Sequence, residues 1–145
     1  MTVLSEEILK DLELARKVIT TEDCNLVVVK YEKIWKKKKG EGIRPILEAI
    51  IEMDEEINGS VIGERTLGKA SALLCRYAKA SGVYSTEGTK TAIALLIMGG
   101  VPCQVDKMIP FIQKNETNNQ FLFEEILNKV DSPEEAFAIL KEKLL

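Results

Sequence analysis

The chain has 145 residues, of which 46% are hydrophobic and 30% are charged, and its formal net charge is −3. This length suits one domain with its own core, so we expect residues 1–145 to form a single domain. The slightly acidic balance excludes the basic field that nucleic-acid-binding proteins usually carry, and we expect no nucleic-acid partner.

The sequence also indicates a cellular location. We see neither a signal peptide nor an apolar run long enough to span a membrane. The three cysteines, Cys24, Cys75 and Cys103, are widely spaced in apolar surroundings, which is typical of reduced thiols rather than of disulfides. We therefore expect a cytoplasmic protein with no membrane partner.

Two absences limit the chemistry that the chain can perform. It contains no histidine and no cysteine pair of the C-x-x-C type. Zinc sites draw mainly on these ligands, and a serine or cysteine nucleophile normally uses histidine as its base. We therefore expect neither a metal site nor a cofactor, and triad-type hydrolysis is excluded in its usual form. The sequence assigns no catalytic residue.

The N-terminal third predicts a helix followed by a hairpin. Apolar residues recur at helical spacing over residues 6–20, with Ser5 as the N-cap. A β-branched run within residues 25–31 and the following residues 33–37 predict two short strands with a tight connection. We expect these strands to pair in an antiparallel hairpin.

The rest of the chain alternates between helix and strand. The expected helices are about 45–55, 67–80 and 89–98, and the expected strands are 60–63, 83–85 and 102–105. Gly82 is expected to end the second of these helices, and Pro102 places the last strand near a sheet edge. A polar loop over residues 115–120 and two C-terminal helices follow. The helices from about residue 121 are expected to pack on the same domain.

This order of elements predicts the fold class. Strands that alternate with helices imply right-handed crossovers and parallel pairing. The expected fold is therefore α/β, a three-layer α/β/α sandwich on a mixed sheet. In such sheets, ligands bind at the carboxyl ends of the strands, against helix N-termini.

The segment from Gly63 to Ala70 nearly matches a phosphate-binding loop. It departs from the pattern G-x-x-x-x-G-K-[ST] at Ala70, which stands where a hydroxyl should hold magnesium. No aspartate at the end of an apolar strand supplies the second magnesium ligand. A looser site for an anion or a phosphate-bearing ligand is the stronger interpretation.

Three helix starts fall at this predicted edge, and each offers free backbone N–H groups near positive charge. The ligand-binding residues that we predict are Arg44, Arg65, Thr66, Gly68 and Lys69. Lys69 and Arg44 would supply charge, while Gly68 and Thr66 would supply backbone and hydroxyl contacts. The structural alternative is that Gly68 only allows a close helix approach and that Lys69 is solvated.

Two other features have a structural and a functional interpretation. Trp35 precedes four lysines, at 36–39, which could contact nucleic acid or an acidic partner. We favour the interpretation that these lysines protect an edge strand. Cys103 could be a reactive thiol, but nothing nearby in the sequence lowers its pKa, so a packed core thiol is favoured.

Several segments together resemble a small uncharacterised family, a domain of unknown function built on the cytidine-deaminase-like fold. The segments are Asp11–Lys17, Asn25–Lys30, Gly42–Leu47, Gly68–Leu74 and Asp131–Ala136. The resemblance runs from about Asp11 to the C-terminus and implies a fold that agrees with the element order above. Members carry a Cys-Pro-Met-Glu-like turn near the C-terminal helices, where this chain has Phe121-Leu122-Phe123-Glu124.

The resemblance does not carry over the chemistry of active deaminases. Zinc deaminases hold the metal and a general acid/base glutamate at the N-termini of the second and third helices. The corresponding turns here, 42–44 and 66–69, have no His, Cys or Glu. The resemblance therefore implies a scaffold without zinc-dependent deamination, and fold analogy assigns no function.

The leading hypothesis from the sequence is a non-zinc, non-deaminating domain that binds a small anionic or nucleotide-like ligand at helix N-termini. The alternative is a structural or regulatory interaction protein that forms a homo-oligomer and has no small-molecule site. A third hypothesis, an enzyme that uses Lys69 or Cys103 without metal, has no second residue to complete a mechanism.

Overall fold

The computed structural model describes residues 5–113 and 120–145. The helices are α1 (Glu6–Thr21), α2 (Arg44–Met53), the 3-10 helix η1 (Asp54–Ile57), α3 (Lys69–Tyr77), α4 (Lys90–Met98), α5 (Gln120–Ile126) and α6 (Pro133–Leu144). The strands are β1 (Leu26–Lys30), β2 (Lys33–Lys38), β3 (Val61–Leu67), β4 (Gly82–Thr89) and β5 (Cys103–Ile109). The predicted polar loop lies outside the described residues except for Gln120, which begins α5.

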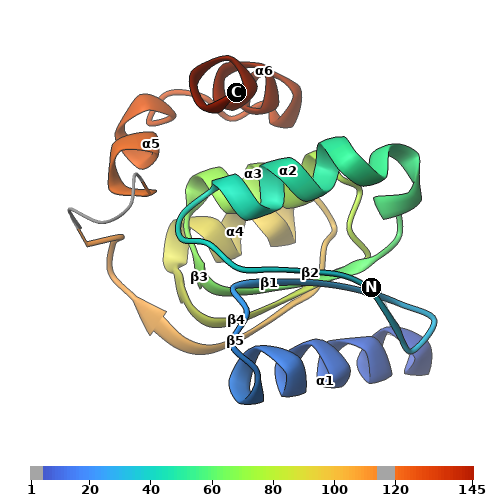
Figure 1. Cartoon of the computed structure of the whole chain (residues 1–145). Helices are drawn as coiled ribbons and strands as arrows, with labels where there is room; N and C mark the ends of the chain where they lie inside the picture. Colours follow the sequence, from blue (N-terminus) through green and yellow to red (C-terminus); the bar gives the residue numbers. More distant parts are fainter. Residues whose placement is uncertain (1–4, 114–119) are drawn as a thin grey trace.

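The strands form one mixed sheet in the order β2-β1-β3-β4-β5. Strand β1 is antiparallel to both of its neighbours, whereas β3, β4 and β5 are parallel. Helix α1 covers one face of the sheet, and α2, α3 and α4 cover the other (Figure 1). The predicted α/β/α sandwich on a mixed sheet and the edge position of the last strand are confirmed.

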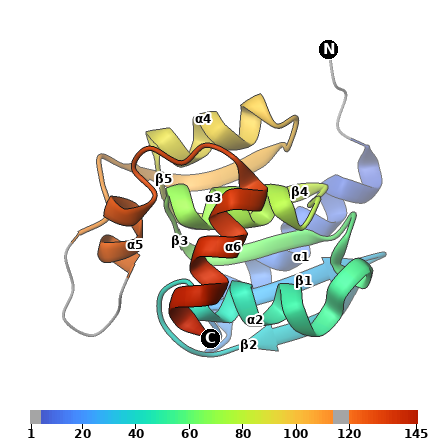
Figure 2. The ribbon, with the colours of Figure 1, turned by 90° about the horizontal axis from the view of Figure 1, so that it is seen from above.

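Helix α6 lies over the outer side of α2 and α3, as the view from above shows (Figure 2). Ala136 and Leu140 of α6 are fully buried and belong to the same apolar cluster as α2, α3 and α4. A separate cluster fills the space between α1 and the opposite face of the sheet. Each face of the sheet therefore has its own core, which explains why β1 reads as a continuous apolar run.

The hairpin turn follows from its two central residues. Tyr31 and Glu32 both have positive φ, 56° and 59°, which matches the type I′ turn that suits the twist of a two-residue hairpin. The backbone N–H of Glu32 donates to Asp11 Oδ1 of α1 at 2.8 Å. This bond ties the turn to the helix that precedes it in the chain.

Gly63 lies inside β3 and not in a loop. A Cβ at this position would come within 2.8 Å of Val27 Cγ1 and 3.2 Å of Ala15 Cβ, so the glycine allows α1 to approach the sheet closely. Because β3 continues to Leu67, only Gly68 separates the strand from α3. The resemblance of this segment to a phosphate-binding loop is therefore confined to the sequence.

The parallel strands are longer than predicted. Polar residues end the apolar pattern, but backbone pairing continues through them, with Thr66 opposite Glu87 and Glu87 opposite Lys107. Helix α3 consequently begins at Lys69 and not near residue 67. The prediction that Gly82 ends α3 is wrong, because Gly82 begins β4 and the left-handed residue after the helix is Lys79, with φ 56°.

The lysine run lies on β2, an edge strand, as predicted. Lys36 and Lys38 contact Glu52 of α2 at 2.6 and 2.8 Å, and Lys37 contacts Glu22 after α1 at 2.8 Å. These ion pairs join the edge strand to the helices on both faces of the sheet.

Candidate functional site

The N-terminus of α3 binds a carboxylate that belongs to the chain itself. Glu124 of α5 accepts hydrogen bonds from the backbone N–H groups of Lys69, at 2.6 Å, and Ala70, at 2.9 Å. Burial raises the pKa of Glu124, while the two amides and the charge of Lys69 act in the opposite direction. The free N–H groups that the sequence offered to a ligand are therefore occupied by Glu124 in this structure.

Gly68 makes this contact sterically feasible. A Cβ on Gly68 would clash with the Glu124 carboxylate, lying 2.8 Å from its Cδ, and would be 2.9 Å from Ile112 Cγ1. The φ of Gly68 is −111°, which any residue adopts, so the glycine is needed for space and not for backbone conformation. The close-approach alternative for Gly68 thus has direct structural support.

Lys69 and Arg44 lie at helix starts on the same face of the sheet, and both hold the C-terminal helices. The Lys69 ammonium donates to the carbonyl of Asn128 at 3.0 Å and lies 3.0 Å from Asp131 Oδ1. The Arg44 guanidinium donates to the carbonyl of Leu144 at 2.8 Å, at the end of α6. Their charge is directed toward the chain itself.

Arg65 and Thr66 also have partners within the protein. The Arg65 guanidinium donates to the carbonyls of Cys24 and Glu22, both at 2.9 Å, and so holds the segment between α1 and β1. The Thr66 hydroxyl donates to Glu87 Oε1 of β4 at 3.1 Å. The five predicted residues therefore lie near the carboxyl ends of the strands, but their side chains do not converge on one empty space.

A pocket does lie between the start of α2 and the second half of β3. It has a volume of about 180 Å³. The segment before α2 contributes Gly40 and Gly42, whose φ angles of 121° and 74° favour glycine. The remaining lining residues are Asn25, Leu26, Glu41, Pro45, Glu64, Arg65, Thr66 and Gln120. The pocket is thus built where the topology predicts ligands to bind.

Glu64 is the residue in this pocket that sequence reasoning missed. It is 5% exposed, and its Oε2 has no hydrogen-bond partner among the described residues. Burial raises the pKa of Glu64 to about 8, and a hydrogen bond with Ser71 of α3 acts in the opposite direction. The carboxyl is therefore mainly neutral at pH 7 and can both donate and accept a hydrogen bond. The signal in the sequence was a glutamate that follows the apolar residues Val61 and Ile62 after one glycine, Gly63.

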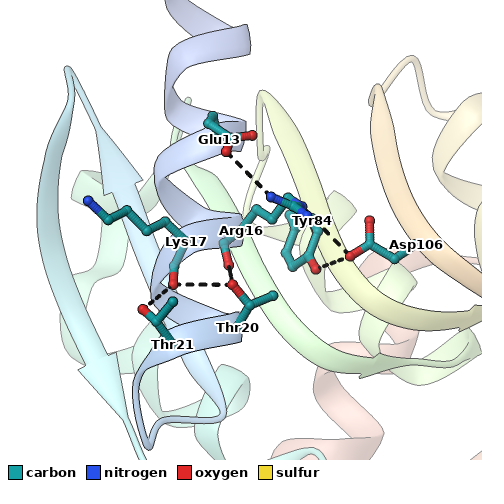
Figure 3. A network of polar contacts seen from close by, with 7 residues as sticks. All are labelled: Glu13, Arg16, Lys17, Thr20, Thr21, Tyr84 and Asp106. Carbon is teal, nitrogen blue, oxygen red and sulfur yellow. Dashed lines mark hydrogen bonds and ion pairs between the residues drawn. The ribbon is translucent and has the colours of Figure 1, made fainter.

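A second polar cluster lies on the opposite face of the sheet, beside α1. The Tyr84 hydroxyl donates to Asp106 Oδ2 at 2.5 Å, and Arg16 of α1 lies 3.9 Å from the same oxygen (Figure 3). Tyr84 is fully buried, and burial together with Asp106 raises its pKa. The close-up shows the three side chains pointing toward one another, which joins α1 to β4 and β5.

The cysteines do not form a reactive centre in the described part of the chain. Cys24 and Cys75 are buried, Cys103 is partly buried, and all three are free thiols. Burial raises the pKa of Cys103, as expected for a packed thiol and opposite to what activates a nucleophile. Residues 5–113 and 120–145 also contain no group of three or more Cys, Asp or Glu side chains arranged to hold a metal ion.

The comparisons with known proteins decide the family. The family model described as "Domain of unknown function (DUF1893)" matches residues 14–144. The chain belongs to the DUF1893 family. Among solved structures, a DUF1893 family protein from Thermotoga maritima has a TM-score of 0.82 and 24% sequence identity, over 98% of this chain and 93% of that one. No curated protein matches the sequence.

A second solved structure places this DUF1893 chain among deaminase-like folds. RibD from Acinetobacter baumannii has a TM-score of 0.53 and 12% identity, over 70% of this chain and 36% of that one. At 12% identity, this similarity shows a shared fold and nothing about activity. The DUF1893 description itself assigns no activity. In the described part of the chain, none of the helices has the length and hydrophobicity needed to cross a bilayer.

Proposed function

We propose that this DUF1893 domain binds a small polar, nucleobase-like ligand in the pocket between the start of α2 and the second half of β3. The observation that carries the proposal is Glu64, a buried carboxyl in the wall of the pocket with an oxygen that no described residue satisfies. Buried polar groups are normally hydrogen-bonded. An unsatisfied carboxyl oxygen in the wall of a pocket therefore supports a ligand that supplies the missing hydrogen bond.

The chemistry of the lining supports a ligand that hydrogen-bonds in two directions. A neutral carboxyl pairs well with a group that has a donor and an acceptor side by side, such as the amide-like edge of a nucleobase. The small volume, about 180 Å³, suits one ring or a group of similar size. An anion is less favoured in this pocket, because Glu41 lines it and Arg65 is engaged with backbone carbonyls.

The sequence-based proposal of an anion at the start of α3 stays open as a competing form of the same function. In that form, a phosphate group would have to displace Glu124 from the amides of Lys69 and Ala70. The two forms differ in the residue that matters, Glu64 in the pocket or Lys69 at the helix start. This difference makes them separable by mutation.

The test is a thermal-shift panel of nucleobases, nucleosides, nucleotides, sugar phosphates and inorganic phosphate. A ligand at about a hundred times its dissociation constant stabilises by roughly 2.7 kcal/mol, which is several degrees for a domain of this size. We expect nucleobases or nucleosides to shift the wild type and Lys69→Ala, but not Glu64→Leu, which removes both the donor and the acceptor at similar size. Glu142→Leu, at an exposed glutamate on α6, is the matched control and should behave as the wild type.

Two outcomes would contradict the pocket proposal. Phosphate-bearing compounds that shift the wild type and Glu64→Leu but not Lys69→Ala would favour the anion site at α3. No shift from any compound would remove the proposal of a small-molecule site and leave the homo-oligomeric interaction protein as the better hypothesis.

We further propose that the chain works in the cytoplasm and without nucleic acid. The three free, buried or partly buried thiols support a reducing compartment. Lys36, Lys37 and Lys38 of β2 are paired with Glu22 and Glu52 and so offer little charge to a phosphate backbone. We also infer one domain, because α6 shares the apolar cluster of α2, α3 and α4.

A further inference from the structure

The two edges of the sheet differ in how they are protected. Strand β2 has the sequence KIWKKK, in which four of six residues are lysines, a common device against edge-to-edge pairing. Strand β5 has the sequence CQVDKMI, with one aspartate and one lysine among seven residues. Among the described strands, none pairs with the outer edge of β5. This edge is thus open to a further strand and lacks the protection seen at β2.

The helix next to β5 presents apolar side chains to solvent. On α4, Ile97 is 63% exposed and Met98 is 77% exposed, while on β5 itself Met108 is 59% exposed. Figure 2 shows α4 beside β5 on the flank that α6 leaves uncovered, because α6 lies over α2 and α3. Ile97 and Met98 lie close to the start of β5, because they precede the short turn into it. Met108 is near the other end of β5 and shares a face with Asp106, on the side of α1. The exposed apolar surface next to the unpaired edge on the α4 face is therefore formed by Ile97 and Met98, and such a surface beside an open edge marks an interaction site.

We propose that β5 and α4 form a two-fold interface with a second copy of this chain, in which the two β5 strands pair antiparallel. The first argument is the direction of the backbone groups. The N–H of Val83 donates to the carbonyl of Pro102 at 3.0 Å, so in the parallel ladder the N–H and C=O groups of Cys103, Val105 and Lys107 point outward. Strand addition uses such outward groups.

The second argument is that one register of this pairing avoids like-charge contacts between copies. A two-fold axis at Val105 places it opposite the partner's Val105 and places Gln104 opposite the partner's Asp106. Like charges do not then face each other, whereas an axis at Asp106 or at Lys107 would oppose identical charges. Closed two-fold dimers are the commonest oligomers, and this one would pair the two edges and bring the exposed faces of α4 together.

The first test is the mass in solution by sedimentation equilibrium, over the widest range of concentration that the protein allows. The chain has a mass of 16.2 kDa, and we expect twice this value. Ile97→Glu should restore the single-chain mass without loss of folded structure by circular dichroism, because Ile97 is exposed. The matched control is Ile34→Glu on β2, which is 41% exposed on the other edge and should leave the dimer intact.

The second test fixes the register. In an antiparallel hydrogen-bonded pair the Cα atoms are about 5.5 Å apart, within the range of about 4.4–6.8 Å that a disulfide spans. Val105→Cys in a Cys103→Ser background should therefore cross-link two chains on mild oxidation, whereas Cys103→Ser alone should not.

Three outcomes would overturn the proposal. They are a single-chain mass for the wild type at every concentration, a dimer that persists in Ile97→Glu, and a dimer lost in Ile34→Glu. The last two would place the contact elsewhere. A dimer that responds as expected but does not cross-link through Val105→Cys would keep the interface and reject the register.

Discussion

At the scale of single residues, Glu64 makes the stability of the folded protein depend on pH. Its pKa in the folded protein is about 8, above the ordinary value of 4.5. Between these values the folded state keeps a proton that the unfolded state has released, so stability falls as pH rises from about 4.5 to about 8. Below pH 4.5 the carboxyl is neutral in both states, so stability does not change with pH. Above pH 8 it is charged in both states, and the stability does not fall further.

We predict that Glu64→Gln removes this pH dependence. Each pH unit inside the window is worth about 1.4 kcal/mol, so the wild type should lose roughly 2–3 kcal/mol relative to the variant between pH 5.5 and pH 7.5. The measurement is urea unfolding of both proteins at several pH values. Parallel curves for the two proteins would show that Glu64 is not responsible. The control Glu142→Gln should follow the wild type, since that side chain is exposed.

Gly68 provides a second prediction at this scale. In Gly68→Ala the new Cβ would press on the Glu124 carboxylate and on Ile112, both part of the contact between α3 and α5. Overpacking of this kind destabilises by about 1–3 kcal/mol. The comparison is Gly82→Ala, where the nearest atom, Ile8 Cγ2, is 3.3 Å from the added Cβ and belongs to a side chain. Equal free energies of unfolding for the two variants would count against a special role of Gly68.

At the scale of elements, Glu124 connects α5 to the start of α3. A carboxylate at a helix N-terminus satisfies N–H groups that have no partner within the helix, and it also interacts favourably with the helix dipole. We predict that Glu124→Ala costs about 2 kcal/mol of stability and speeds amide exchange at Lys69 and Ala70. Hydrogen exchange and urea unfolding measure the two effects.

The neighbouring glutamate supplies the control for this prediction. Glu125 is on the same helix but is exposed, so Glu125→Ala should change stability by less than about 0.5 kcal/mol. If Glu124→Ala leaves the exchange of Lys69 and Ala70 unchanged, Glu124 does not cap α3 in solution.

The same contact shows what the sequence could and could not predict. The apolar spacing of α1, its Ser5 cap and the β-branched run of β1 are local signals, and they predict their elements correctly. The start of α3 is also visible as a place that attracts negative charge. The group that binds there, Glu124, lies 55 residues from Lys69, and no local pattern connects the two.

The ends of the strands could not be predicted from the sequence for a related reason. A strand predicted from apolar residues ends where polar ones begin, but Thr66, Glu87 and Lys107 continue the parallel ladder from one strand to the next. Their pairing depends on neighbours that only the folded sheet provides. Glu64 was not predicted as a site residue for the same reason, because the expected strand, residues 60–63, ended one residue before it.

At the scale of the whole molecule, the proposed ligand pocket and the proposed dimer interface use different parts of the sheet. The pocket is formed by β1, β3, α5 and the segment before α2, whereas the interface is formed by β5 and α4. Strand β4 lies between them in the sheet. Because no residue belongs to both surfaces, neither proposal requires the other.

This separation leads to a last prediction. A ligand that shifts the melting temperature of the wild type should produce the same shift in Ile97→Glu, even though loss of the dimer lowers the starting temperature of that variant. The measurement is a ligand titration of both proteins, each compared with its own ligand-free curve. A shift that disappears in Ile97→Glu, while its circular dichroism is unchanged, would mean that binding and association are coupled across β4. In that case Tyr84 would be the residue to examine, because its hydroxyl joins β4 to Asp106 of β5.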